Sequence, residues 1–424
     1  MMSFESFPTM LRACGAAAVL TFSVAGCDLE SLLEVTDPSR LLAEDVEVPS
    51  QADALVLGLE ADFLCTLSAL YTTQALISDE FEDHSASGNA WPADRRRGAE
   101  NDTWAANDCT SFPNSVYTPA GRSRWVADNL VTLLSGWSDA EVANRTERIA
   151  RAYLLGGFSL AALGVTNCSA AIDVGPELTS LQILALAETR FTSALTGGGT
   201  DITSAARLGR ARVRMYMGDN AGALADAGAV PAGFSLSMIP SSSTSRLSNQ
   251  VWRANIFSTR YGVPVWTQAL TTGGVLDPRT LTYNTGESSG WGPGPIFGQM
   301  KYTTGSSPMP FARYEEAQLI IAEITGGATA VAVINALRAP HPTLPVFAST
   351  VEADIQAEIA LERQRELWFE GFRLYDIRRL NLALVPAVDT GYQVGIKGGT
   401  YGDKTCLPIP QTETFNNPNF TGGA

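Results

Sequence analysis

The sequence predicts a mainly α-helical protein, and three observations carry that prediction. Apolar residues recur three and four positions apart over long stretches, for example Leu55, Leu59 and Phe63, which is the spacing of one helix face. Several such stretches follow one another in pairs joined by short turns, as in helical repeat proteins. Hydrophobic residues make up 45% of the 424 residues, which is enough for a sizeable core.

The N-terminus precedes these helices and has a different character. Residues 11–24 are apolar and rich in small side chains, and at about a dozen residues they are too short to span a bilayer as a helix. The run ends at Val24-Ala25-Gly26-Cys27, which resembles a bacterial lipobox, a cleavage site before a cysteine that becomes lipid-modified. We therefore expect residues 1–26 to be a lipoprotein signal peptide and Cys27 to carry acyl chains. A buried N-terminal helix with an incidental cysteine is the alternative.

Residues 27–50 follow as an acidic tether, in which Arg40 is the only basic residue. Such a charged segment repels itself and stays extended, so it would hold a folded body away from the membrane. A single domain over residues 51–424 is expected to form that body.

The scaffold of this domain is predicted in two helical blocks, residues 51–234 and 311–380. The expected helices cover residues 51–77, 125–134, 140–163, 181–195, 204–217, 221–229, 313–324 and 330–338. The turn Gly218-Asp219-Asn220 joins two helices whose small residues allow close packing, as in a tetratricopeptide hairpin. Gly326-Gly327 would form the corresponding turn in the second block, and about four candidate helical pairs result.

Three regions of the domain lack helical periodicity, namely residues 78–118, 235–310 and 381–424. The second is rich in Ser, Thr, Gly and Pro and the third ends in a Gly, Pro and Asn-rich tail, so we expect loops and short strands there. Loops on a rigid scaffold commonly carry functional residues, and we expect function in these regions.

Residues 361–380 read LERQRELWFEGFRLYDIRRL and are predicted to form the last scaffold helix. A helix would place Glu362, Glu366 and Glu370 in one row, with arginines beside them. Charges this dense beside aromatic residues predict a partly buried ionic network, with Gly371 at a close approach of another backbone. Paired catalytic carboxylates are the alternative, but adjacent arginines would keep both carboxylates ionised and leave no general acid.

The same segment resembles the C-terminal signature of the SusD/RagB family of nutrient-uptake lipoproteins. The matching residues are Glu362, Arg363, Arg365, Glu366, Glu370, Gly371, Arg373, Asp376 and Arg378. The resemblance implies a SusD-like fold with about four tetratricopeptide-like pairs. It also implies an outer-membrane lipoprotein that faces the cell exterior and binds glycan or another oligomeric nutrient. Such a protein delivers its ligand to a SusC-type, TonB-dependent transporter without catalysis.

Aromatic side chains in the loops are the candidate ligand contacts. Sugar rings stack their C–H faces on exposed aromatics, while side chains such as asparagine bond the hydroxyls. The resemblance places the ligand face in the loops after the first helices and in the loop-rich middle. The residues expected there are Trp91, Asn101, Trp104, Trp291 and Tyr302. For each aromatic residue, packing in the core is the alternative.

Cysteine usage permits disulfides in the mature chain. Cys14 would leave with the signal peptide and Cys27 would carry lipid, so Cys65, Cys109, Cys168 and Cys406 remain. Four cysteines outside the cytoplasm allow two disulfides in any of three connectivities. They form no C-x-x-C pair, which argues against a zinc or thioredoxin-type site.

The net charge of −15 and the scarcity of basic runs exclude nucleic acid as a partner. The only such run, Arg95-Arg96-Arg97, is interpreted as a solvated loop, and so is the acidic stretch of residues 80–84, although that stretch could instead bind a cation. Residues 286–290 match G-x-S-x-G but lack the strand and helix of a nucleophile elbow. We therefore expect no catalytic residue, cofactor or metal. A tetratricopeptide-type scaffold that binds only protein and a glycosidase are the competing functions.

Overall fold

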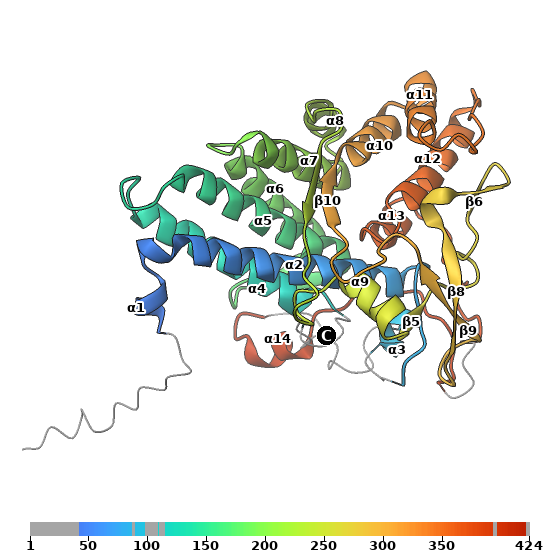
Figure 1. Cartoon of the computed structure of the whole chain (residues 1–424), viewed down its shortest axis with the longest axis horizontal. Helices are drawn as coiled ribbons and strands as arrows, with labels where there is room; N and C mark the ends of the chain where they lie inside the picture. Colours follow the sequence, from blue (N-terminus) through green and yellow to red (C-terminus); the bar gives the residue numbers. More distant parts are fainter. Residues whose placement is uncertain (1–41, 87–89, 98–108, 110–114, 393–396, 421–424) are drawn as a thin grey trace, which may run out of the picture. The chain divides into compact units, whose positions relative to one another are not determined.

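The computed structural model describes residues 42–86, 90–97, 109, 115–392 and 397–420 (Figure 1). The chain divides into two units, Met1–Val46 and Glu47–Ala424. The described part of the first unit contains one short helix, α1 (Ala43–Val46). The boundary between the units falls inside the predicted tether, and all further elements belong to the second unit.

The second unit is built mainly from helices, which confirms the predicted fold class. Its main helices are α2 (Ala52–Ile77), α4 (Tyr117–Gly136), α5 (Arg145–Thr166), α6 (Ser180–Ala194), α7 (Thr200–Met217), α8 (Asn220–Gly228), α10 (Tyr314–Thr325), α11 (Gly327–Arg338), α12 (Glu352–Glu366) and α13 (Arg373–Arg379). Shorter turns are η1 (Pro49–Gln51), α3 (Trp91–Asp94), α9 (Gln250–Trp252), η2 (Arg253–Phe257), η3 (Pro278–Thr280) and α14 (Gln411–Asn416).

Successive helices pack against one another from α4 to α8, and the row continues through α10, α11 and α12 (Figure 1). The predicted hairpin is present, because Gly218 ends α7 with φ +86° and Asp219 caps α8 by accepting the Gly222 N–H. Glycines allow the close approach of α5, α6 and α7. A Cβ at Gly157 would lie 2.8 Å from the Phe191 ring, and one at Gly209 would lie 2.5 Å from it.

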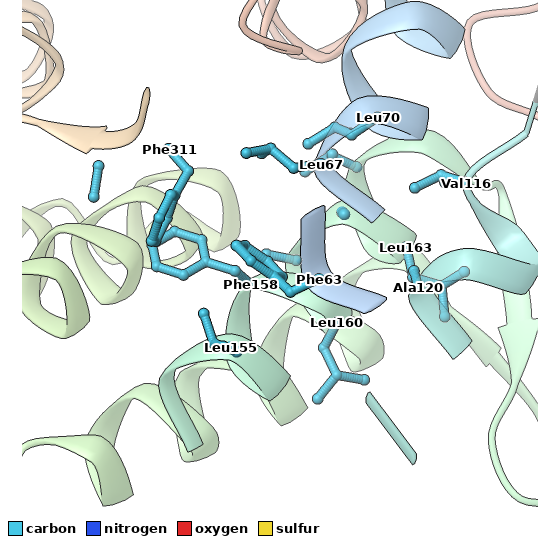
Figure 2. Close-up of a cluster of buried hydrophobic side chains, with 14 of the residues drawn as sticks. Phe63, Leu67, Leu70, Val116, Ala120, Leu155, Phe158, Leu160, Leu163 and Phe311 are labelled. Carbon is cyan, nitrogen blue, oxygen red and sulfur yellow. The ribbon is translucent and has the colours of Figure 1, made fainter. Parts of the chain in front are cut away.

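Aromatic side chains from distant elements form the centre of the core (Figure 2). Phe63 of α2 and Phe158 of α5 both meet Phe311 of β10, with centroid distances of 5.1 and 5.0 Å and nearly perpendicular rings. Two helices, Pro49–Ile77 and Arg145–Thr166, are long and apolar enough to cross a membrane, but most of each is buried inside the fold. Core helices commonly have this composition.

The strands of the described residues form small two-stranded antiparallel sheets. They are β1 (Glu82–Asp83) with β5 (Tyr261–Gly262), β2 (Ser169–Ala171) with β3 (Glu177–Thr179), β4 (Ser235–Met238) with β10 (Met309–Arg313), β6 (Thr271–Thr272) with β7 (Val275–Leu276), and β8 (Thr282–Ser288) with β9 (Pro295–Gln299). Most of them lie in the loop-rich middle, as the sequence predicts.

Residues 361–380 do not form one helix, which corrects the prediction. α12 ends at Glu366, and the chain then reverses through Phe369 and Gly371, whose φ angles are +56° and +75°. The reversal places the Trp368 and Phe369 side chains in the core, where both are fully buried. Burial of two large aromatic side chains therefore outweighs the helical charge pattern, and Glu370 does not continue the row of Glu362 and Glu366.

The ionic network that this segment was expected to form is present, and its partners come from several elements. Arg363 donates to both carboxylate oxygens of Asp376, at 2.8 and 3.0 Å. Other pairs of the motif are Arg373 with Asp79, Glu362 and Glu366 with Arg279, Glu370 with Lys301 and Arg313, and Arg365 with Glu358. The motif therefore joins α12 and α13 to η3, to β10 and to the turn that follows α2, and its carboxylates are paired with basic side chains.

Two disulfides join the four remaining cysteines. Cys65 of α2 is bonded to Cys109, with their Cα atoms 5.6 Å apart. Cys168, just after α5, is bonded to Cys406, with a Cα distance of 5.1 Å. The second bond ties the C-terminal region to the helical scaffold.

Candidate ligand-binding site

Two of the predicted ligand contacts, Trp91 and Trp291, lie against each other although they are far apart in the chain. Their ring centroids are 6.3 Å apart and their planes differ by 29°, which is a stacked arrangement. Both side chains are partly exposed. The structure therefore unites the first and the second loop-rich regions at an aromatic surface.

Trp91 is fixed at the start of α3. Its indole N–H donates to the backbone oxygen of Ser85 at 3.3 Å. The ammonium of Lys397 lies 5.2 Å from the centre of its ring, a cation–π contact that comes from the C-terminal region. The orientation of this tryptophan thus depends on segments at both ends of the domain.

Trp291 lies in the connection between β8 and β9, and this connection is attached to the first loop at His84. The Trp291 N–H donates to Ser289 Oγ at 3.0 Å, and Ser289 Oγ donates to the backbone oxygen of His84. Gly292 packs directly on the His84 ring, where a Cβ would lie 2.0 Å from Nδ1. A glycine is therefore required at position 292 for the hairpin to reach the first loop.

Residues 80–84 are buried, which corrects the prediction of a solvated acidic loop. The Asp83 carboxylate accepts a hydrogen bond from Lys397 Nζ at 2.7 Å, and both side chains are fully buried. Glu82 Oε1 lies 3.1 Å from His84 Nε2. The Asp83 carboxylate is therefore neutralised by a lysine from a distant segment, which the local sequence does not reveal.

Within the basic triplet, Arg96 is buried, which corrects the prediction of a solvated loop at this residue, whereas Arg97 is exposed. Arg96 is only 1% exposed, and its guanidinium donates to three backbone oxygens, those of Val385, Pro386 and Gly402. These carbonyls replace water around the cation, so its burial is tolerated. Arg96 thereby attaches the first loop to the C-terminal region.

Burial also shifts the pKa of two carboxyl groups in this part of the fold. Burial raises the pKa of Asp94 to about 7, and the nearby Asp83 carboxylate adds to the effect. Burial likewise raises the pKa of Glu80 to about 8, with the Asp79 carboxylate as the second cause. Asp94 still accepts hydrogen bonds from the Asp83 N–H, at 2.9 Å, and from the Tyr392 hydroxyl.

The chemistry of these residues suits binding. Within the described ranges, no group of three or more His, Cys, Asp or Glu side chains is arranged to hold a metal ion. The hydroxyl of Ser289 donates to a backbone carbonyl instead of to an imidazole, and Ser288 of the G-x-S-x-G match lies in β8, without the helix that a nucleophile elbow needs. Partly exposed indole rings remain as surfaces on which a sugar could stack.

The other predicted contacts do not join the tryptophan pair in the described part of the chain. Tyr302 is 2% exposed, and its hydroxyl donates to the backbone oxygen of Phe369 at 3.3 Å. This tyrosine packs in the core, so the expectation of a ligand contact is not met there. Asn101 and Trp104 lie outside the described residues, as does Cys27.

Sequence reasoning missed His84 and Lys397 as the residues that support the pair. In the sequence, His84 stands out only as a member of an acidic stretch that could bind a cation, and Lys397 lies in a region without helical periodicity. No periodicity or motif signals either role, because each depends on contacts between segments more than a hundred residues apart.

The second unit contains several cavities, one beside the β8–β9 hairpin and others elsewhere in the fold. One of about 230 Å³ lies beside the β8–β9 hairpin and is lined by Glu82, Val265, Gln268, Pro293, Pro295 and Phe297. Two larger ones, of about 550 and 420 Å³, lie along β4 and β10. A small cavity of about 20 Å³ between Phe63, Tyr71 and Phe311 has room for little more than water.

The fold is mainly helical, and two of its loop-rich regions meet at the Trp91–Trp291 pair. Residues 297–422 match the model of the SusD family. This C-terminal part of the chain is thus similar to the SusD family, and the chain has the SusD-like fold over most of its length. The match includes the motif of residues 362–378, on which the sequence-based prediction rested.

Solved structures show the same fold at low sequence identity. A SusD superfamily protein from Bacteroides vulgatus matches with a TM-score of 0.64 at 16% identity, over 88% of this chain and all of that one (100%). A SusD-like carbohydrate binding protein from Bacteroides fragilis matches with a TM-score of 0.64 at 14% identity, over 87% and 98% of the two chains. A laminarin binding SusD-like protein matches with a TM-score of 0.57 at 14% identity, over 88% and 98%. No curated protein sequence matches significantly.

Proposed function

We propose that this chain binds an oligosaccharide at the Trp91–Trp291 surface without chemically changing it. The observation that carries the proposal is the stacking of two partly exposed tryptophans from separate loop-rich regions. Indole rings are well suited to the apolar faces of sugars, and the backbone amides of the surrounding loops can bond hydroxyls. The SusD-like proteins described as carbohydrate binding and laminarin binding support sugar as the ligand class.

The same proposal includes a place of action at the outer membrane. The lipobox at Cys27 and the acidic tether support a lipid-anchored protein on the cell exterior. The match of residues 297–422 to the SusD family model supports delivery of the ligand to a TonB-dependent transporter of the SusC type and a role without catalysis.

A glycan panel that includes laminarin, titrated calorimetrically against the mature protein, tests the binding step. Trp291→Ala and Trp91→Ala should each weaken binding of the bound glycan about tenfold or more, because each removes a large aromatic contact. Trp125→Ala is the matched control, since Trp125 is 54% exposed on α4, away from the proposed surface. Undiminished binding by both variants, or release of shorter sugars from the glycan, would contradict the assignment.

Delivery is tested separately by purification of the acylated protein from outer membranes in mild detergent. A barrel transporter should co-purify with wild-type protein and with Trp291→Ala alike. If no barrel protein is recovered while glycan binding persists, the delivery step is wrong and the binding step stands.

A further inference from the structure

β4 is an edge strand with hydrogen-bonding groups that no part of the described chain uses. Its only partner strand there is β10, with Ser235 opposite Arg313 and Ser237 opposite Pro310. The Tyr314 N–H donates to the Phe234 oxygen at 2.8 Å, which makes Ser235 and Arg313 a non-hydrogen-bonded pair. The N–H and C=O of Ser235 therefore point away from β10.

The backbone N–H and C=O of Ser237 point away from β10 as well. Its partner Pro310 has no N–H and cannot form a hydrogen-bonded pair, so the Ser237 backbone groups also point outward. Outside the ladder with β10, no hydrogen bond of the described residues involves the backbone of Ser235 or Ser237. The open edge thus presents two donors and two acceptors with the two-residue repeat of a strand.

The outer edge of β10, the partner strand of β4, is not open in the same way. Arg212 Nη2 donates to the Phe311 oxygen at 2.8 Å, and the Tyr71 hydroxyl donates to the Pro310 oxygen. The β10 backbone is therefore covered by side chains of α7 and α2. Only the β4 edge is left as a template for another strand.

A groove accompanies this open edge. Ser235 and Ser237 line the cavity of about 550 Å³, together with apolar surface from Pro278, Leu281 and Met300, of which Met300 is 48% exposed. The adjoining cavity of about 420 Å³ shares Ser235, Arg313 and Glu366 with it and continues along α10 and α11. The side chains of an added strand that face the same way as Ser235 and Ser237 would enter this groove.

The charges that line the groove are already balanced. Arg279 is paired with Glu362, Lys301 with Glu370, and Arg313 with Glu366, at 2.5 to 2.7 Å. A charged ligand would therefore gain no free partner of opposite sign, whereas an uncharged one fits the apolar surface beside β4.

We propose that β4 binds an extended, uncharged segment of a partner protein, which adds to it as a third strand. The main-chain groups of Ser235 and Ser237 would bond the segment, and alternate side chains would enter the groove. This protein-binding edge is separate from the proposed glycan surface, because it shares no residue with the Trp91–Trp291 pair. The outward N–H and C=O groups of Ser235 and Ser237 are spaced two residues apart, as in a β-strand. This spacing matches the main chain of a peptide and favours a peptide over a sugar chain as the occupant.

The test uses a randomised octapeptide display library selected on the mature protein, followed by calorimetry with the enriched peptides. Ser237→Pro removes one outward N–H of the edge but no hydrogen bond to β10, so it should fold and bind these peptides at least about tenfold more weakly. Ser237→Ala keeps the backbone donor and should bind as wild type does. Both variants should keep their affinity for glycan.

A second measurement does not depend on the folding of any variant. N-methylation of alternate peptide residues should abolish binding in one register and leave it intact in the other, because only every second N–H faces β4. Failure to enrich any peptide, equal binding by Ser237→Pro, or indifference to N-methylation would overturn the proposal. Concentration-dependent dimers that Ser237→Pro abolishes would assign the edge to a second copy of the chain and would also overturn it.

Discussion

At the scale of single residues, glycine decides how tightly the reversal after α12 can pack. Gly371 has φ +75°, and a Cβ there would lie 2.8 Å from Leu70 Cγ. Position 371 therefore combines a backbone conformation that L side chains rarely adopt with a lack of space. Gly218 has a similar φ of +86° but nothing within 4 Å of a Cβ.

Comparison of Gly371 with Gly218 separates the cost of backbone strain from the cost of overpacking. Gly371→Ala should destabilise the fold by about 2–4 kcal/mol, because backbone strain and overpacking add. Gly218→Ala should cost only about 1 kcal/mol, which is the strain alone. Urea unfolding followed by circular dichroism measures both, and equal losses would show that the contact with Leu70 is unimportant.

Glu80 makes stability depend on pH near neutrality. Its pKa is about 8 in the folded protein, where burial is the main cause, against 4.5 for an ordinary glutamate. The folded state therefore holds this proton more tightly than the unfolded state. The stability that this proton contributes is fully present below about pH 4.5 and is lost as the pH rises through about 8. Asp94, with a pKa of about 7, acts in the same direction.

Glu80→Gln should be more stable than wild type at pH 8, by on the order of 1–3 kcal/mol, and similar to it at pH 5. The amide stays neutral and can still accept the hydrogen bond from the Phe369 N–H. Urea unfolding at several pH values measures how steeply the free energy of unfolding changes with pH. Glu287→Gln, on the exposed part of β8, is the control and should leave this pH dependence unchanged. If Glu80→Gln shows a pH dependence as steep as that of wild type, Glu80 is not its cause.

At the scale of elements, the SusD/RagB motif acts as a clamp between short helices. α13 has seven residues and is too short to be stable on its own. Arg363 of α12 holds it through Asp376, and the side chains of this pair are 1% and 5% exposed. Arg379 binds the same Asp376 and Glu323 of α10, so the clamp includes three helices.

Arg363→Ala should therefore cost about 3 kcal/mol or more of unfolding free energy, because it leaves the Asp376 carboxylate buried with fewer partners. Arg145→Ala is the comparison, since its partner Asp139 is 75% exposed and the pair should contribute less than about 1 kcal/mol. Thermal unfolding of both variants measures the contrast. If the two losses match, the motif is not a clamp.

At the scale of the whole molecule, loops from three parts of the chain converge on the tryptophan surface. Arg96 and Lys397 join the first loop to the C-terminal region, and the contact of His84 with Gly292 joins it to the middle. The disulfide between Cys168 and Cys406 attaches the C-terminal region to α5. The binding surface is thus a property of the assembled domain and not of one segment.

The proposed anchor also concerns the whole molecule. Cys27→Ser should remove acylation and release the protein from the membrane fraction, because the remaining chain would carry no lipid. Metabolic labelling with a radioactive fatty acid and membrane fractionation measure both effects. Cys14→Ser, inside the predicted signal peptide, is the control and should leave the label in place; label retained by Cys27→Ser would show that the lipobox prediction is wrong.

The sequence by itself predicted the helical class, the resemblance to the SusD/RagB family and most helix positions, because periodicity and the Glu362–Arg378 motif are local patterns. It also named Trp91 and Trp291. It could not predict that Tyr302 packs in the core or that residues 361–380 reverse direction.

Only the tertiary structure decided which charges are buried. Arg96 and the acids of residues 80–84 look solvated in a local sequence, yet each is neutralised or hydrogen-bonded within the fold, with partners that include the distant Gly402 and Lys397. The stacking of Trp91 on Trp291 depends on the same long-range contacts. The physical reason is that burial energies depend on neighbours in space, which local periodicity does not specify.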